Sequence, residues 1–174
     1  VEKSILGDKE SLIRVVNANK KEIEWDDLIS DILVKDTRLM NVKSRFIMDI
    51  SIKTLTDKNA FGKIKRRFNS KSFNNSSCYF AVDYKEYLLG MNQDEHTENF
   101  YLRNMAENLL VKDINILKKF RGVIITAKEI ETKDYGYLLS LIRELNLEVI
   151  YDHGKSDLTR SFLKDANISL VMGE

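Results

Sequence analysis

The sequence predicts an α/β fold, a mixed sheet with a C-terminal parallel β-α-β-α-β unit and N-terminal helices. Two observations carry this prediction. Short apolar runs alternate with helical patterns over the last third of the chain, and helical periods dominate its first 44 residues. No linker, low-complexity tract or internal repeat interrupts the 174 residues. We therefore expect a single domain, in which residues 1–44 form helices and residues 45–174 form the sheet-containing core.

The N-terminal segment has the spacing of amphipathic helices. One helix is expected over residues 8–20, with Asp8 as its start signal. A second is expected from Trp25 to Val34. Its apolar face would consist of Leu28, Ile29, Ile32 and Leu33.

After the predicted N-terminal helices, the spacing of the apolar residues changes to the two-residue alternation of strands. The apolar residues Phe46, Met48, Ile50 and Ile52 alternate with Ile47, Asp49, Ser51 and Lys53, which predicts a strand with one buried face. Cys78 to Asp83 is apolar on both faces and predicts a central strand. From Thr97 to Phe120, apolar residues at helical spacing predict a long helix.

The C-terminal third predicts strands and helices in alternation. The expected elements are a buried strand from Gly122 to Thr126, a helix between Thr132 and Asn146, a strand from Leu147 to Tyr151, a helix opened by Ser156, and a strand from Ile168 to Met172. Strands that alternate with helices in this way imply parallel pairing through right-handed crossovers.

Composition excludes several classes of protein. The chain is 43% hydrophobic and 32% charged. Its net charge is only +1, so its overall charge does not attract it to nucleic acid or to a membrane surface. It has no apolar run of about 20 residues, the length that spans a bilayer. Its one cysteine excludes an internal disulfide. We therefore expect an intracellular protein, cytoplasmic or nuclear, with no membrane partner.

Several enzyme motifs are absent from the sequence. The chain lacks both the Gly-x-Gly-x-x-Gly fingerprint and the Gly-x-x-x-x-Gly-Lys-Ser/Thr loop, which disfavours dinucleotide-binding and P-loop enzymes. It lacks the Gly-x-Ser-x-Gly elbow of acyl transfer. His96 and His153, the two histidines, lie far apart in the sequence, which disfavours a zinc site.

One stretch of the nearly neutral chain is strongly basic. Residues 58–82 contain six lysines and arginines, with no Asp or Glu. Such side chains contact phosphate oxygens, and each neutralised phosphate releases counterions. We therefore expect residues 58–77 to bind nucleic acid, DNA in particular, through Lys63, Lys65, Arg66, Arg67 and Lys71. The alternative is a solvated connection whose charges are balanced by acidic residues elsewhere in the fold.

Acidic residues on two predicted strands flank this stretch. Asp49 lies in the first strand, whereas Asp83 ends the second and is followed two residues later by Lys85. A period of two places Asp83 and Lys85 on one face. Two carboxylates can hold a Mg²⁺ ion that polarises a phosphodiester, and a lysine can orient or activate the attacking water. Asp49, Asp83 and Lys85 are therefore candidate catalytic residues, with Asp49 and Asp83 as metal ligands.

The same residues fit a second interpretation that involves no catalysis. Asp83-Tyr84-Lys85-Glu86 matches a helix N-cap with Glu at the third helical position. In that case Asp83 caps a helix that continues through Leu88 and Leu89, and Lys85 is solvated.

At these residues the chain resembles the restriction-endonuclease-like, or PD-(D/E)xK, superfamily of nucleases. Asp49 would match the first acid, and Asp83-Tyr84-Lys85 the D-x-K element, over about residues 22–151. The resemblance implies a Mg²⁺-dependent nuclease, or a nuclease-fold DNA-processing protein, that hydrolyses phosphodiester bonds.

Two other hypotheses are open. Phe120 to Ile125 with the following helix and strand resembles BRCT-type modules, which implies a non-catalytic protein- or nucleic-acid-binding module of a larger DNA-repair or processing assembly. A homodimer is equally compatible with the sequence. The terminal β-α-β-α-β unit by itself favours a ligand-sensing Rossmann-like domain, with a pocket at the strand ends near Thr126, Tyr151 and Met172.

Overall fold

The computed structural model describes residues 2–4, 11–15, 23–35, 44–69, 77–90, 97–105, 114–131, 133, 135–152 and 170–172. Within these residues, eight strands form one sheet in the order in which they occur in the sequence. The first strand runs antiparallel to the second, and every later pair of neighbours is parallel. The strands are β1 (Glu2–Ser4), β2 (Ser11–Val15), β3 (Ser44–Asp49), β4 (Ser77–Asp83), β5 (Phe100–Arg103), β6 (Gly122–Thr126), β7 (Glu148–Asp152) and β8 (Leu170–Met172).

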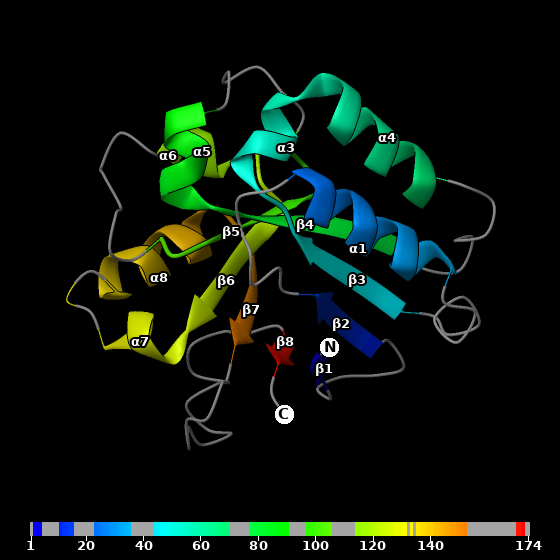
Figure 1. Cartoon of the computed structure of the whole chain (residues 1–174). Helices are drawn as coiled ribbons and strands as arrows, with labels where there is room; N and C mark the ends of the chain where they lie inside the picture. The colour runs from blue at the N-terminus through cyan, green and yellow to red at the C-terminus, as the bar shows by residue number, and fades with distance from the viewer. Residues whose placement is uncertain are drawn as a thin grey trace.

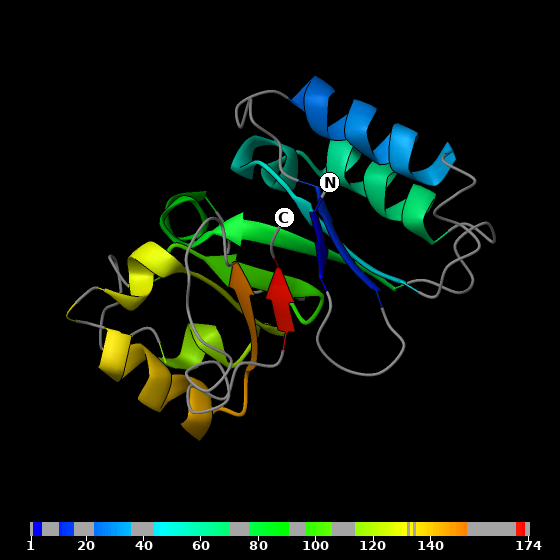
Figure 2. The same ribbon diagram turned by 90° about the horizontal axis from the view of Figure 1, so that it is seen from below.

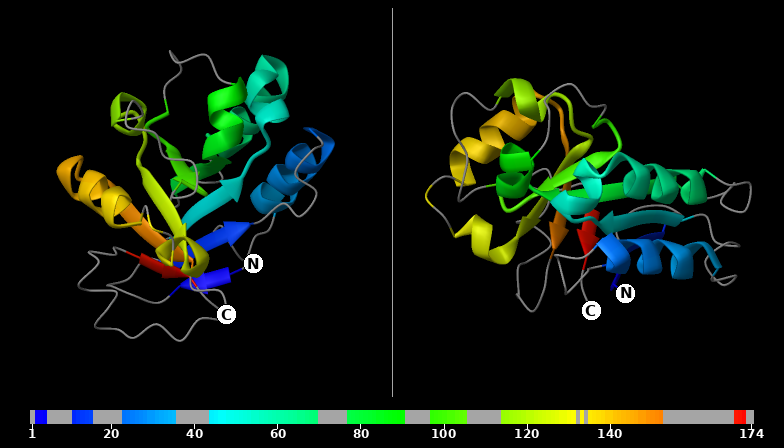
Figure 3. Two further views of the ribbon diagram at one scale, coloured as in Figure 1. Left: turned by 90° about the vertical axis from the view of Figure 1, so that its left-hand side faces the viewer. Right: turned by 45° about the horizontal axis from the view of Figure 1, so that its top comes forward.

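The sheet curls until its first and last strands, β1 and β8, lie side by side (Figure 3). A parallel sheet closed in this way has an interior and an exterior, as in a (β/α)₈ barrel, although here the first strand is reversed. The predicted α/β class with a mixed sheet is therefore confirmed.

Helices cover the exterior of the curled sheet (Figures 1 and 2). On one side α1 packs along α4, and α8 lies on the opposite side of the molecule. The described helices are α1 (Ile23–Lys35), α3 (Ile52–Thr56), α4 (Lys58–Phe68), α5 (Tyr84–Gly90), α6 (Ile114–Leu117), α7 (Ala127–Ile130) and α8 (Tyr135–Glu144). None of the described helices is long and apolar enough to span a bilayer.

The strands contribute to two apolar cores because successive residues point to opposite faces of the sheet. The larger core lies between the helices and the exterior face, and Phe46 and Met48 of β3 belong to it. The smaller core fills the interior and consists of Ile47, Ala81, Tyr101, Ile124 and Ile150. The prediction of one buried face for the first sequence-predicted strand is wrong, because closure of the sheet also buries Ile47 and Asp49.

A polar network closes the amino end of the interior. The Glu148 carboxylate accepts hydrogen bonds from Arg45, from the Tyr101 hydroxyl at 3.0 Å and from Arg121 at 3.1 Å. The guanidinium groups of Arg45 and Arg121 lie 5.5 and 5.7 Å from the centroid of the Tyr79 ring. Burial, with the nearby charge of Glu148, raises the pKa of Tyr101, so the hydroxyl stays protonated and can donate. We call these five residues the base network.

Two sequence-predicted helices are wrong in the described residues. Residues 11–15 form β2 rather than part of a helix over 8–20, since a short apolar run that includes Ile13 and Val15 has no decisive period and favours a strand. The long helix from Thr97 to Phe120 is replaced at its start by β5, whose four residues are all buried. Strands buried on both faces lose the two-residue alternation that identifies them in a sequence.

The remaining predicted elements are confirmed where the structure describes them. A helix covers Trp25 to Val34, and strands occupy the predicted positions at β4, β6, β7 and β8. The first predicted strand is confirmed up to Asp49, but its last residues are wrong, since Ile52 and Lys53 begin helix α3 after the N-cap Ser51. These C-terminal strands are parallel, as expected. The predicted cap Thr132 and the helix opened by Ser156 lie outside the described residues.

The tight pairing of β6 with β7 generates the first prediction. A Cβ atom added to Gly122 would lie 2.1 Å from the backbone oxygen of Glu148. Gly122→Ala should therefore lower the free energy of unfolding by at least about 2 kcal/mol, because two backbones must move apart. At Gly136, on α8, an added Cβ meets nothing within 4 Å. Gly136→Ala should stabilise by up to about 1 kcal/mol through helix propensity. Urea unfolding of both variants checks this, and equal midpoints would contradict it.

Candidate ligand site at the carboxyl end of the barrel

The last residue of each of five consecutive parallel strands is polar. These residues, which we call the mouth ring, are Asp49 of β3, Asp83 of β4, Arg103 of β5, Thr126 of β6 and Asp152 of β7. Each lies two positions after a residue of the interior core and therefore on the interior face of its strand. In parallel barrels, active and binding sites lie at the carboxyl ends of the strands. The mouth ring is therefore the candidate functional site.

Asp49 and Arg103 form a buried ion pair within the mouth ring. Asp49 is 2% exposed and Arg103 is 6% exposed. The Nε of Arg103 lies 3.7 Å from Oδ2 of Asp49, too far for a hydrogen bond, and it has no hydrogen-bond partner. A buried guanidinium nitrogen without an acceptor is costly. Arg103 thus retains a donor at the mouth of the barrel.

The turn that follows Asp49 is held by the buried carboxylate of Asp26 on α1. Its Oδ2 accepts hydrogen bonds from the backbone of Ser51 at 3.0 Å and from the Thr54 hydroxyl at 2.5 Å. The Ser51 hydroxyl in turn caps α3 by accepting from the backbone N–H of Thr54 at 3.2 Å. The Ile50 N–H bonds to the neighbouring strand β4. These contacts fix the end of β3 and therefore the position of Asp49.

Asp83 links the ends of β4 and β5. Its Oδ1 accepts from the backbone N–H groups of Lys85 and Glu86 at 3.0 and 3.2 Å, which caps α5. Its Oδ2 accepts from the Asn104 side-chain amide at 2.6 Å. Asn104 has a φ of 56°, in the left-handed region that Asn tolerates better than most residues. The capping interpretation of Asp83-Tyr84-Lys85-Glu86 is what the structure shows, and Lys85 is exposed.

Thr126 opens helix α7 through a reciprocal capping box. Its hydroxyl accepts from the Glu129 backbone, and the Glu129 carboxylate, 3% exposed, accepts from the Thr126 N–H at 3.0 Å. Asp152 is half-buried and pairs with Thr126 in the register of β6 and β7. The site therefore combines carboxylates, a guanidinium, a hydroxyl and an amide.

The structure places the predicted catalytic residues in different surroundings. Asp49 and Asp83 end neighbouring strands, with Asp49 in register with Ala81, two residues before Asp83, whereas Lys85 lies on the exposed surface of α5. Their catalytic role stays a prediction. Within the described part of the chain, no group of three or more Asp, Glu, His or Cys residues could hold a metal ion.

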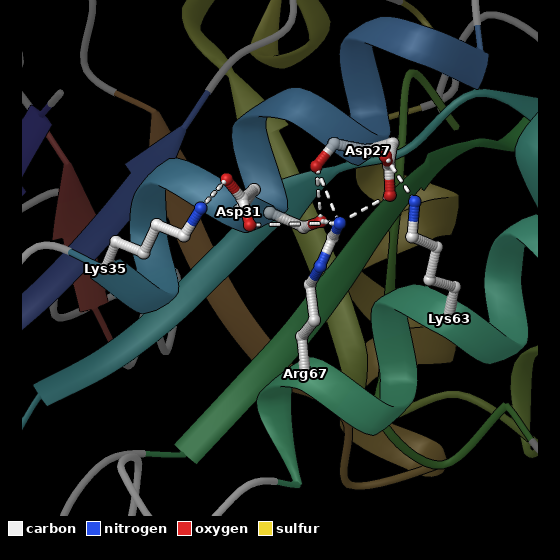
Figure 4. A network of polar contacts seen from close by, with 6 residues as sticks. Asp27, Asp31, Lys35, Lys63 and Arg67 are labelled. Carbon is white, nitrogen blue, oxygen red and sulfur yellow. Dashed lines mark hydrogen bonds and ion pairs between the residues drawn. The ribbon is translucent and has the colours of Figure 1, made fainter.

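Acidic residues of α1 pair with basic residues of α4, as Figure 4 shows. Lys63 bonds to Oδ2 of Asp27 at 2.8 Å, and Arg67 bonds to Oδ1 of Asp27 at 2.5 Å and to the Ser30 hydroxyl at 2.6 Å. Burial alone would raise the pKa of Asp27, but the hydrogen bonds and charges of Lys63 and Arg67 outweigh burial and lower it. Lys65 and Arg66 are exposed, and Lys71 lies outside the described residues.

Comparison with known proteins identifies the fold. No protein-family model and no curated protein matches the sequence. Among solved structures, the FimX EAL domain matches with a TM-score of 0.67 and 14% identity, covering 99% of this chain and 85% of that one. The c-di-GMP-bound FimX EAL domain from Pseudomonas aeruginosa matches with a TM-score of 0.63 and 16% identity, covering 99% and 86%. The MucR phosphodiesterase in complex with c-di-GMP matches with a TM-score of 0.62 and 11% identity, covering 87% and 74%.

These neighbours overturn the resemblance to PD-(D/E)xK nucleases and the functions drawn from it. The fold is that of EAL domains, so the nuclease hypothesis and the DNA-repair module are both wrong. The mistake has a physical cause: an acid at a strand end followed by Lys is also the start of a capped helix, which is what Asp83 forms. The Rossmann-like alternative expected a pocket near the strand end at Thr126, which belongs to the mouth ring, but the sheet there is curled into a barrel rather than open.

The prediction that residues 58–77 bind DNA is also wrong. The neighbours whose ligand is named bind c-di-GMP. In addition, the charges of Lys63 and Arg67 are compensated by Asp27, as the alternative interpretation of this stretch expected.

Sequence reasoning missed Arg103 as a site residue, and it reached Thr126 and the strand end at Asp152 only through the Rossmann-like alternative. A signal was available for each, since all three follow directly after an apolar run. Arg103 was hidden because β5 had been assigned to a long helix.

The capping role of Asp83 generates a prediction about stability. Asp83→Ala should lower the free energy of unfolding by about 1–2 kcal/mol, since two backbone N–H groups and the Asn104 amide lose their acceptor. Lys85→Ala, two residues further on and exposed, should change it by less than about 0.5 kcal/mol. Urea unfolding monitored by circular dichroism compares the two. An equal loss in both variants would show that Lys85 has a structural partner.

The ion pairs between α1 and α4 predict a pH dependence. The folded-state pKa of Asp27 is below its ordinary value of 3.8, so its contribution is present above that pH and is lost as the pH falls through the lower, folded value. Asp27→Asn should therefore destabilise the protein near neutral pH by about 1 kcal/mol or less, because the site is partly screened by solvent. The difference from wild type should shrink in acid. Thermal unfolding at a series of pH values tests this, with Lys53→Ala, an exposed position on α3, as the control. A difference that grows on acidification would contradict it.

Proposed function

We propose that this chain binds a cyclic dinucleotide of the c-di-GMP type at the mouth ring. The observation that carries the proposal is the set of polar residues at the ends of β3 to β7, with the buried Arg103 at its centre. The fold shared with the c-di-GMP complexes of FimX and MucR supports it. We also propose that residues 1–174 form a single domain, since strands from both ends of the chain belong to one sheet.

The donors and acceptors of the mouth ring match the chemistry of such a ligand. A phosphodiester offers anionic oxygens, which a guanidinium such as that of Arg103 binds with charge-assisted hydrogen bonds. Guanine offers N–H donors at its edge, which the carboxylates of Asp83 or Asp152 can accept. Ribose oxygens match the Asn104 amide. A ligand with both charged and neutral polar groups can therefore form hydrogen bonds with more residues of the mouth ring than a simple anion can.

Mg²⁺ is the cofactor that the sequence predicts at Asp49 and Asp83, and the described residues fit it poorly. Mg²⁺ takes oxygen ligands in octahedral geometry. Asp49 is paired with the guanidinium of Arg103, and Asp83 already accepts three hydrogen bonds. No third acidic residue of the described part completes a cluster with them. We therefore assign ligand binding to this site and derive no hydrolytic step through a metal.

Isothermal titration calorimetry with c-di-GMP tests the proposal. Wild type should bind, and cyclic AMP should bind more weakly because it has one phosphate and one base. Asp83→Asn keeps an N-cap, since Asn caps helices as well as Asp, but it removes the charge. This variant should weaken c-di-GMP binding by about tenfold, the loss of one charge-assisted hydrogen bond.

Glu144→Gln is the matched control, because it removes an exposed carboxylate at the end of α8. It should leave the affinity unchanged. Chromatography of the ligand after incubation with Mg²⁺ should show no linear dinucleotide. Absence of c-di-GMP binding by a folded wild type would refute the proposed function.

A further inference from the structure

Arg103 is a buried cation with one hydrogen-bond donor, its Nε, that the described protein does not use. The residue is 6% exposed, and its Nε has no hydrogen-bond partner. Its charge is balanced by Asp49, whose Oδ2 lies 3.7 Å away, a distance at which charges attract but do not share a hydrogen. Nearly all buried polar groups in folded proteins are paired, and an exception calls for an explanation. A bound anionic oxygen would supply the missing acceptor.

We infer that Arg103 binds a phosphodiester of the ligand directly and makes its binding independent of any divalent cation. The inference rests on the proposed function. It adds that Arg103 is the residue that contacts the phosphate and that its guanidinium supplies the positive charge. A Mg²⁺ ion at Asp49 would have to approach a carboxylate that already holds a guanidinium, and like charges at this range repel in a site of low dielectric. The positive charge that a phosphate needs is therefore supplied by the protein chain itself.

The surroundings of Arg103 hold the guanidinium in place for this role. Asp49 is fixed by the turn after β3, which Asp26 anchors from α1. Next along the chain, Asn104 bonds to Asp83 at 2.6 Å and so fixes the end of β5. The planar fork of arginine can present two parallel N–H groups to two phosphate oxygens, which lysine cannot do. A purely structural ion pair would predict instead that ligand affinity is unaffected when both of its charges are removed.

Calorimetry of c-di-GMP binding in EDTA and in excess Mg²⁺ provides the test. Wild type should bind with the same affinity in both buffers. Removing Arg103 alone would take its guanidinium away from the buried Asp49 carboxylate, so the main variant is the double substitution Asp49→Asn with Arg103→Met, which removes both charges and keeps their volume. It should bind at least about tenfold more weakly. Arg103→Lys, which keeps the charge but loses the fork, should show a smaller loss. Exposed Arg66→Met on α4 is the control and should bind as wild type does.

Each outcome decides the inference. Equal wild-type affinity in both buffers, with loss in the double variant and none in Arg66→Met, supports it. Binding that requires Mg²⁺ overturns it and leaves the proposed function standing. Undiminished binding by the folded double variant also overturns it and assigns the ion pair a structural role. No binding by wild type in either buffer refutes the proposed function, and the inference with it.

Discussion

Closure of the parallel sheet is the constraint on which the rest of this molecule depends. Once β8 meets β1, every second side chain of a strand enters a closed interior, and whatever lies there must be apolar or paired. The interior core meets this condition in the middle, and the base network meets it at the amino end by giving the Glu148 carboxylate three donors. Only the carboxyl end retains an unsatisfied polar atom within the interior of the described strands, the Nε of Arg103.

The contrast between the two ends of the barrel distinguishes architecture from function. Buried ion pairs contribute little to stability on balance, because desolvation offsets their attraction. The base network limits that cost through short contacts and aromatic faces around its charges. In the pair of Asp49 and Arg103, the Nε of Arg103 lies 3.7 Å from Oδ2 of Asp49 and has no hydrogen-bond partner. A barrel that needed only to fold would be served as well by apolar residues at these positions, which is why we propose a ligand for this pair.

The sequence indicated part of the candidate site and connected it to the wrong family of proteins. Asp49 and Asp83 stood out because each is an acid within or at the end of an apolar run, and the structure does place both at strand ends. Their roles could not be deduced from the sequence. A helix that follows a parallel strand needs a capping residue at the strand end, and ligand sites of such sheets lie at the same strand ends, so a polar residue there fits either role. Asp83 and Thr126 both cap helices and belong to the mouth ring. Arg103 escaped notice because its strand is buried on both faces and lacks the alternation of a half-exposed strand.

The sequence by itself determined the α/β class, the helix from Trp25 to Val34 and the parallel strands of the C-terminal third, since local period and capping signals depend only on neighbouring residues. Tertiary structure decided the rest. Whether the sheet stays open or closes depends on contacts between β1 and β8, which lie at opposite ends of the chain. Pairing of Asp49 with Arg103, and of Asp27 with Arg67, likewise joins residues that are distant in sequence. These contacts pair Arg67 of the basic stretch with an acidic residue of α1, and they place Asp49 beside Arg103 at the mouth of the barrel.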